Sequence, residues 1–293
     1  MQRASETQFH LTDKISVPQA IELAVGRVNS AIDQFDPVAA FGLFSGGHDS
    51  FTASYIASLA KRFSGVAHLN TGIGVEETRE YVRETAKSRG WKLTEIKAIE
   101  NTYSDGRPNP QDYFEMVRIH GFPGPGQHWR MYVRLKERGI HRLIRENKRK
   151  GSREVVALVS GARSQESDRR KINVTKMIDK RGGQLWISPI WDFSKLDCSR
   201  IMEFSKQPRS PVVDLIHKSG ECLCGAFSKP GELEELEMWF PKAAAPIRAL
   251  AEEIKDKFPW GWGGRPPMKN CPIKKAGIMC SSCGNDQHEL VFT

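Results

Sequence analysis

One short segment, Ser45-Gly46-Gly47-His48-Asp49-Ser50, constrains the fold more than any other feature of the sequence. It directly follows the apolar run at residues 38–44 and directly precedes a helix-like stretch at residues 51–63. A buried strand that ends in a turn with two glycines and then opens a helix lets the chain approach an anion closely. Such a turn also points free backbone N–H groups and the positive helix end at the anion. The segment therefore predicts a phosphate site, with an ordinary strand–turn–helix junction as the alternative.

Strand and helix patterns alternate around this segment. Strands that alternate with helices predict βαβ units, so we expect an α/β fold with a doubly wound, mostly parallel sheet. Residues 101–127 are rich in Pro, Gly, Asp and Asn, which predicts a loop that could move over a ligand. The predicted helices cover residues 17–33, 51–63, 76–89 and 243–258, and the predicted strands cover residues 38–44, 66–70, 92–98, 154–159 and 184–188.

The hexapeptide resembles the PP-loop, Ser-Gly-Gly-x-Asp-Ser, of the ATP pyrophosphatases, and it lacks the lysine of a Walker loop. Further segments resemble the phosphoadenosine phosphosulfate (PAPS) reductase-like branch of that superfamily. They are Asn70-Thr71-Gly72 with Glu77-Thr78, Gly161-Ala162-Arg163 with Glu166-Ser167 and Arg169, and Pro189-Ile190-Trp191 with Asp197. The resemblance covers about residues 38–225 and implies an adenine nucleotide α-hydrolase-like fold. The role of the last segment is expected to be structural.

The resemblance implies a site for ATP. Arg163 is the expected phosphate clamp, because a guanidinium holds phosphate through two parallel charge-assisted bonds. Asp49 either coordinates Mg²⁺ or orients the phosphates, or it is simply a carboxylate stabilised at a helix start. His48 is expected to face solvent. Catalysis is assigned to Ser45, Asp49, Ser50 and Arg163, and nucleotide binding to Ser45, Gly46, Gly47, Asp49, Ser50, Thr71, Gly72, Gly161 and Arg163.

Five of the six cysteines lie after residue 220: Cys222, Cys224, Cys271, Cys280 and Cys283. Four thiolates are what a [4Fe–4S] cluster or a Cys₄ zinc site requires. The spacing resembles iron–sulfur members of the PAPS reductase-like group, including the sulfur-transfer proteins of DNA phosphorothioation, although Glu289 stands where one of their patterns has a fourth cysteine. We expect Cys222, Cys271, Cys280 and Cys283 as ligands, with Cys224 as the alternate fourth. Zinc or free redox thiols are the alternatives, and Cys198 is expected to be a buried, small apolar residue.

Composition and charge limit the setting of the protein. The 293 residues allow a large core, and we expect an N-terminal helical extension at 1–36, a PP-loop nucleotide-binding domain at 37–207 and a cysteine-rich, metal-binding region at 208–293. The sequence has no bilayer-spanning apolar run and no secretory signal, which predicts a cytoplasmic protein without a membrane partner. The net charge is +9, many cations lie at residues 130–150, and a second basic cluster follows at Arg169, Arg170 and Lys171. Such a stripe suits a nucleic acid backbone or nucleotide phosphates, or it is a solvated helix face.

These features together favour an ATP pyrophosphatase that adenylates a nucleic acid for sulfur insertion. DNA is preferred over tRNA because the cysteine spacing is nearer to the phosphorothioation group. A cysteine desulfurase would deliver the sulfur, and homo-oligomerisation is left open. The alternatives are a tRNA thiolation enzyme, a PAPS or adenylyl-sulfate reductase, and a non-catalytic nucleotide-binding assembly subunit. The reductase interpretation is weakened because residues 285–293 lack the Glu-Cys-Gly-x-His tail used in that chemistry.

Overall fold

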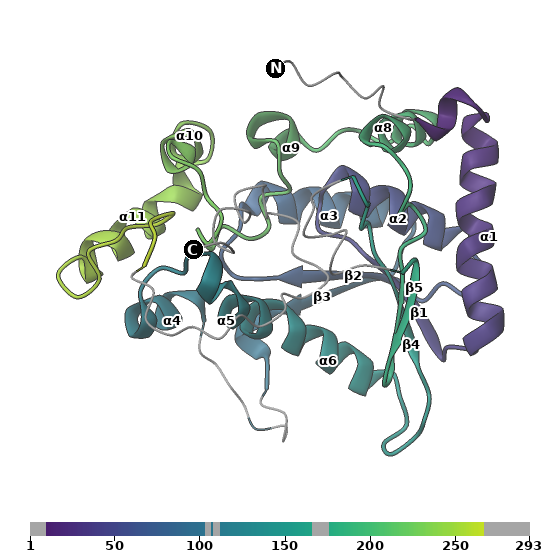
Figure 1. Cartoon of the computed structure of the whole chain (residues 1–293), viewed down its shortest axis with the longest axis horizontal. Coiled ribbons are helices and arrows are strands. Elements are labelled where there is room, and N and C mark those ends of the chain that lie inside the picture. The colour runs from purple at the N-terminus through teal and green to yellow at the C-terminus, as the bar shows by residue number, and fades with distance from the viewer. Residues whose placement is uncertain (1–9, 103–106, 108–111, 166–175, 267–293) are drawn as a thin grey trace, which may run out of the picture.

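The computed structural model describes residues 10–102, 107, 112–165 and 176–266 (Figure 1). At its centre lies a six-stranded sheet in the order β3-β2-β1-β4-β6-β5, and β5 and β6 form its one antiparallel pair. The mostly parallel α/β sheet predicted from the sequence is thus confirmed. The strands are β1 (Ala39–Leu43), β2 (Gly65–Asn70), β3 (Leu93–Lys97), β4 (Val156–Val159), β5 (Ile178–Arg181) and β6 (Gln184–Ile187).

Helices cover both faces of the sheet, which explains why its central strands are apolar without interruption. Successive side chains of a strand point to opposite faces. In β1, Ala40 packs with the helices of one face, whereas Phe41 and Leu43 pack with those of the other. The first face carries α1 (Val17–Phe35), α2 (His48–Ser58), α3 (Glu76–Ser88) and α8 (Lys195–Phe204), and the second carries α6 (Arg138–Glu146) (Figure 1).

A separate group of helices packs beyond the carboxyl ends of the parallel strands (Figure 1). Their shared apolar cluster includes Tyr113, Met116, Leu236 and Ile247. The members are α4 (Tyr113–His120), α5 (His128–Tyr132), α9 (Pro211–Ile216), α10 (Glu232–Trp239) and α11 (Pro241–Ile254). The remaining short elements are a π-helical turn at Val133–Glu137 and 3₁₀ turns at Leu11–Asp13, Ala98–Glu100 and Pro125–Gln127.

Several predictions of local structure were wrong. The segment 101–127, expected to be a loop, contains α4, whose buried Tyr113, Met116 and Val117 recur at helical spacing among the surrounding Pro and Gly residues. The region after residue 208 contains three helices up to residue 266 rather than one. Helix α2 begins at His48, inside the glycine turn, instead of at residue 51. Strand β5 was missed because its pattern is charged and half-exposed. Among the described residues, no helix has both the length and the apolar character needed to cross a bilayer.

Candidate active site

The loop at residues 45–50, which we call the nucleotide loop after its predicted role, joins the carboxyl end of β1 to the start of α2. Gly46 has a φ of +81°, and a Cβ atom there would lie 2.7 Å from Cγ2 of Thr78, so the turn requires glycine. Gly47 is the N-cap of α2 and offers no side-chain acceptor to the first N–H groups of the helix, which suits an anion. The Ser45 N–H donates to Ser50 Oγ at 3.2 Å, and Ser50 Oγ donates to the Gly47 carbonyl at 2.8 Å. The predicted loop residues therefore form one ordered turn.

The segment after β4 closes on this loop. A Cβ atom at Gly161 would lie 2.6 Å from the carbonyl carbon of Asp49, so only glycine permits this approach. Two residues later, Arg163 Nε lies 2.9 Å from Asp49 Oδ2, and the arginine side chain is 7% exposed. The structure thus brings Gly161 and Arg163 to the loop, and it places the expected phosphate clamp in an ion pair with Asp49.

His48, within the loop, departs from its predicted environment, whereas Cys198, close to Asp49, matches it. His48 is 7% exposed, so the expectation that it faces solvent was wrong. Burial lowers the pKa of His48, and the positive charge of Arg209 lowers it further. Cys198 is fully buried, as expected, and burial raises the pKa of its thiol well above the usual range, with the Asp49 carboxylate adding to the rise. Cys198 is therefore a neutral thiol beneath the loop.

The second predicted nucleotide segment, at the carboxyl end of β2, faces another part of the chain. Thr71 is buried, its N–H donates to Glu221 Oε1 at 2.9 Å, and its hydroxyl donates to the Glu221 carbonyl at 2.6 Å. Gly72 is exposed, has a φ of +75°, and donates its N–H to Asn70 Oδ1 at 3.0 Å. Thr71 is thus engaged with Glu221, and Gly72 alone of this pair lies at the surface.

Residues 219–223, which we call the clasp segment, lie along the chain between β2 and α3. A Cβ atom at Gly74 would lie 2.6 Å from the Glu221 carbonyl oxygen, which shows how closely the two backbones approach. A Cβ atom at Gly47 would lie 3.5 Å from Cβ of Ser219, so the clasp segment also adjoins the nucleotide loop. Its hydrogen bonds run from Val75 N–H to Gly220 O (2.9 Å), from Leu223 N–H to Ile73 O (2.7 Å) and from Thr78 Oγ1 to Ser219 O (2.6 Å).

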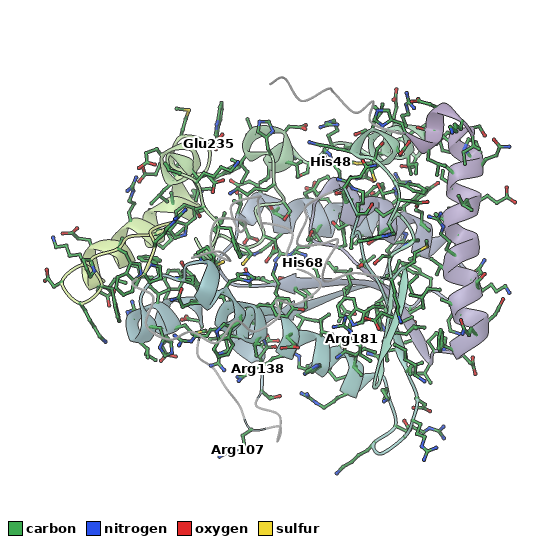
Figure 2. The ribbon with its side chains drawn as sticks, in the orientation of Figure 1. His48, His68, Arg107, Arg138, Arg181 and Glu235 are labelled. Atoms are coloured by element: carbon green, nitrogen blue, oxygen red, sulfur yellow. The ribbon has the colours of Figure 1, made fainter. Side chains whose placement is uncertain are left out.

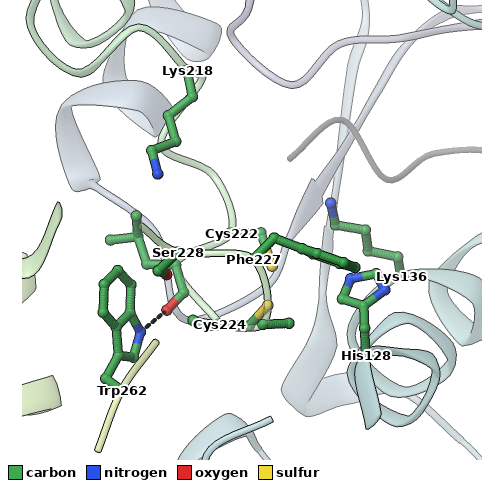
Figure 3. A pocket seen from close by; sticks show the side chains of 11 residues that line it. His128, Lys136, Lys218, Cys222, Cys224, Phe227, Ser228 and Trp262 are labelled. Atoms are coloured by element: carbon green, nitrogen blue, oxygen red, sulfur yellow. Dashed lines mark hydrogen bonds between the residues drawn. The ribbon is translucent and has the colours of Figure 1, made fainter. Parts of the chain in front are cut away.

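Directly after Glu221, the chain forms one wall of a pocket, which we call the thiol pocket after Cys222 and Cys224 in its lining (Figure 3). Both sulfur atoms of Cys222 and Cys224 lie in the space between Trp262 on one side and His128 on the other (Figure 3). Lys136 and Lys218 also line the pocket, and Trp262 Nε1 donates to the Leu223 carbonyl at 2.7 Å. The first-choice metal ligand and its alternate thus occupy the same pocket, next to two ammonium groups.

The described residues supply part of the predicted metal site. Cys271, Cys280 and Cys283 lie outside the described residues. Within the described part of the chain, no three His, Cys, Asp or Glu side chains gather in a metal-binding arrangement. Cys222 and Cys224 give two thiol donors in one pocket. This chemistry fits one position of a four-thiolate set, with Cys222 as the ligand and Cys224 as its alternate, for iron–sulfur or zinc alike.

Sequence reasoning missed a buried pair behind the loops. His68, in β2, lies with Nε2 3.0 Å from Glu221 Oε2 and Nδ1 2.8 Å from the Phe44 carbonyl oxygen. Burial alone would lower the pKa of His68, but the Glu221 carboxylate and the Phe44 carbonyl outweigh it, and the pKa is raised above 6.5. The available signals were a histidine inside an otherwise apolar strand and a glutamate immediately before Cys222.

The predicted basic stripe does not form one surface. Arg134 is buried, Arg142 pairs with Glu100 at 3.2 Å, and Arg149 pairs with Glu154 at 2.7 Å. Lys136 lines the thiol pocket, whereas residues 148–150 precede β4 and so lie at the amino ends of the parallel strands. The stripe therefore runs from the edge that carries the nucleotide loop to the opposite edge. The second basic cluster, Arg169, Arg170 and Lys171, lies outside the described residues.

The phosphoadenosine phosphosulfate reductase domain matches residues 39–221. The chain belongs to this family. The matched part of the PAPS reductase domain contains every predicted nucleotide-binding residue, and it ends at Glu221, so all five predicted metal-ligand cysteines lie beyond it.

Several solved structures are similar to this PAPS reductase family member at low sequence identity. A PAPS reductase from Candida auris, in a phosphate complex, is 16% identical over 73% of this chain and 93% of its own, with a TM-score of 0.46. A Candida glabrata FMN adenylyltransferase with FAD and inorganic pyrophosphate is 12% identical over 73% and 65%, with a TM-score of 0.45. A Methanococcus maripaludis U34-tRNA thiolase with its [4Fe-4S] cluster is 14% identical over 91% and 87%, with a TM-score of 0.39. No curated protein matches the sequence.

Proposed function

We propose that this protein is an ATP pyrophosphatase that adenylates a nucleic acid, DNA in preference to tRNA, for sulfur insertion. One observation carries the proposal: the clasp segment packs against the nucleotide loop, and Cys222, its fourth residue, opens into the thiol pocket. A phosphate loop and a pair of thiols in neighbouring positions suit a reaction in which an acceptor is activated and then receives sulfur. The acceptor oxygen would attack the α-phosphorus of ATP and release pyrophosphate, after which a sulfur nucleophile would displace AMP.

The residues of the loop have distinct parts in this scheme. The N–H groups at the start of α2 and the hydroxyls of Ser45 and Ser50 would hold the phosphates. Gly46, Gly47 and Gly161 would allow the backbone to approach them, with Thr71 and Gly72 at the neighbouring strand end. Because the protein contributes positioning and charge neutralisation, the placement of these groups matters more than any acid–base step.

The ion pair between Asp49 and Arg163 suggests how the site responds to ATP with Mg²⁺. The cation would take the Asp49 carboxylate as a ligand, since Mg²⁺ prefers oxygen ligands. Arg163 would then be released to bind phosphate with two parallel bonds. In the absence of nucleotide, Asp49 keeps the largely buried guanidinium neutralised.

The thiol pocket is the proposed metal centre. Cys222 would bind the metal together with Cys271, Cys280 and Cys283, with Cys224 as the alternate. Trp262 lines the pocket, and the nine residues from Trp262 to Cys271 can extend to about 30 Å. This length is enough for Cys271 to reach the thiols of the pocket. A [4Fe–4S] cluster, when bound, would carry or relay sulfur, whereas zinc would be structural. A cysteine desulfurase is the proposed sulfur donor.

The test is pyrophosphate release from ATP by anaerobically purified protein, with and without DNA or tRNA, alongside its iron content and visible spectrum. We expect pyrophosphate release that DNA stimulates, from a brown, iron-bearing protein. Stimulation by tRNA alone would shift the acceptor to tRNA. Binding of ATP without pyrophosphate release, in the presence of either nucleic acid, would instead indicate a non-catalytic assembly subunit.

A second candidate function is reduction of PAPS or adenylyl sulfate. The observation in its favour is the family itself, because the matching domain is that of PAPS reductase. The discriminating measurement is sulfite release from PAPS with a dithiol reductant, run beside the ATP assay. A colourless zinc protein that consumes PAPS and leaves ATP intact would favour this function.

The three-part division of the chain and a cytoplasmic location remain predictions.

A further inference from the structure

Two buried side chains connect the nucleotide loop with the thiol pocket. His68 lies at the centre of the molecule, in β2 (Figure 2), and its side chain is 1% exposed, while that of Glu221 is 4% exposed. Nε2 of His68 is 3.0 Å from Oε2 of Glu221, and Nδ1 is 2.8 Å from the Phe44 carbonyl oxygen. Phe44 immediately precedes the nucleotide loop, and Glu221 immediately precedes Cys222. The imidazole therefore bridges the two functional segments.

The partners of the ring determine where its hydrogens lie. A carbonyl oxygen only accepts, so Nδ1 of His68 carries a hydrogen directed at Phe44. A neutral ring with hydrogen on Nδ1 has a bare Nε2, which cannot pair with a bare carboxylate oxygen. The 3.0 Å contact between Nε2 and Oε2 therefore requires a proton on one of the two atoms, and it is a buried ion-pair contact.

Glu221 is fixed from its other side as well. Thr71 donates its N–H to Oε1 of Glu221 at 2.9 Å and its hydroxyl to the Glu221 carbonyl at 2.6 Å. Both the carboxyl group and the backbone of Glu221 are thus held. The backbone position of the next residue, Cys222, is fixed as a result. The bridge consequently extends from the end of β1, through β2, to the wall of the pocket.

Stability is a weak reason to bury such a pair, because apolar residues of similar volume are often equally stabilising. A location between two functional segments gives a better reason. Resting on the proposed function, we infer that His68 and Glu221 are positioning residues: they hold the clasp segment in register with the nucleotide loop, so that ATP binding is transmitted to the thiol pocket.

Amide hydrogen exchange of the peptide that covers residues 219–224 measures this coupling, whatever metal Cys222 binds. The probe is a non-hydrolysable ATP analogue with Mg²⁺, added to the full-length protein purified anaerobically. The Leu223 N–H, which donates to the Ile73 carbonyl, reports whether the clasp segment opens. We expect the analogue to slow exchange of this peptide at least about threefold in the wild type.

Three variants separate the links of the bridge. His68→Asn retains a donor toward Phe44 and loses Glu221, while His68→Gln retains contact with Glu221 and loses Phe44. Glu221→Gln preserves both links, because its amide can donate to a neutral Nε2 and still accept from Thr71. We expect both His68 variants to bind the analogue and lose the exchange effect, and Glu221→Gln to retain it. Arg27→Gln, which breaks the distant ion pair with Asp192, is the matched control and should retain it too.

The outcomes are distinct. A His68 variant that binds the analogue and still shows the full exchange effect overturns the inference, and so does a wild type that binds without any response. A wild type that does not bind the analogue overturns the proposed function together with the inference. If His68→Asn fails to fold, His68→Gln and Glu221→Gln still test the inference. Both variants retain the contact between residues 68 and 221, and only His68→Gln loses the link to Phe44, so only His68→Gln should lose the exchange effect.

Discussion

Arg163 reaches across the nucleotide loop to Asp49, with 2.9 Å between Nε and Oδ2. The two residues come from different strand ends, so the pair exists only when β1 and β4 are correctly placed side by side. The arginine is the more deeply buried partner. Removing Asp49 would leave a largely buried cation unpaired, whereas removing Arg163 would leave a partly solvated carboxylate, so the two changes are not equivalent.

Arg163→Ala should weaken ATP binding by tenfold or more, because a pair of charge-assisted bonds to phosphate is worth roughly 1.5–3 kcal/mol. Arg163→Lys should recover only part of the loss, since an ammonium group cannot make two parallel bonds. Isothermal titration with a non-hydrolysable ATP analogue gives both affinities. An unchanged affinity in Arg163→Ala would remove this residue from the nucleotide site.

Ser45→Ala and Asp49→Ala should each abolish pyrophosphate release from ATP while the far-UV circular dichroism spectrum stays that of the wild type. The hydroxyl is the proposed phosphate donor and the carboxylate is the proposed Mg²⁺ ligand, so both would act on the bound nucleotide. Ser58→Ala, at the other end of α2, is the control and should remain active. Full activity in both loop variants would contradict the assignment of the loop.

Gly161→Ala should lower the free energy of unfolding by about 1–3 kcal/mol, because the new methyl group would overlap the backbone of Asp49. Gly26→Ala provides the opposite case, since nothing lies within 4 Å of its added Cβ and the residue is inside α1. There we expect a gain of about 0.5–1 kcal/mol. Urea unfolding of both variants tests the pair, and equal effects would mean that the close approach at Gly161 does not exist.

Asp197 should make folding stability depend on pH in the acid range. Burial alone would raise the pKa of Asp197, but hydrogen bonds from Thr12 and Ser194 outweigh it and hold the pKa below 3.8. A carboxyl group with a depressed pKa stabilises the fold fully above its unfolded value of 3.8 and loses that contribution as the pH falls through the folded value.

The measurement for Asp197 is the difference in unfolding free energy between the wild type and Asp197→Asn. It should be constant between pH 5 and 7 and shrink as the pH falls below 3.8, the ordinary pKa of the group. A difference that stays the same at acid pH would show that these hydrogen bonds do not favour the ionised form. Asp36→Asn, on an exposed carboxylate at the end of α1, is the control.

Arg145→Glu with Lys148→Glu should weaken nucleic acid binding and reduce the slope of log affinity against log salt concentration by about two, if both cations contact phosphates. Arg149→Glu alone should do less, because Glu154 already pairs with that arginine. Fluorescence anisotropy with a short DNA duplex at several salt concentrations gives the slopes. No change in affinity or slope would identify the stripe as a solvated face.

The sequence predicted the nucleotide loop and most of the parallel strands because each depends on local patterns. Ser45 to Ser50 are contiguous, and β1, β2, β4 and β6 are short, mainly apolar segments, with His68 as the exception in β2. Helix α4 was missed because it is short, at eight residues, and is flanked on both sides by segments rich in Pro, Gly, Asp and Asn. The pairing of His68 with Glu221 joins residues 153 positions apart, and nothing in either neighbourhood indicates the other. Long-range polar contacts of this kind depend on packing that no local pattern encodes.

The clasp segment has a consequence for how the protein is made. The nucleotide loop is synthesised about 170 residues before residues 219–223. At about 5–20 residues per second, many seconds therefore pass before the clasp segment that packs against the loop is made. Contacts between positions so distant in the chain also form late in folding. A nascent or truncated chain would thus possess the glycine turn at residues 45–50 before the clasp segment that packs against it has been made.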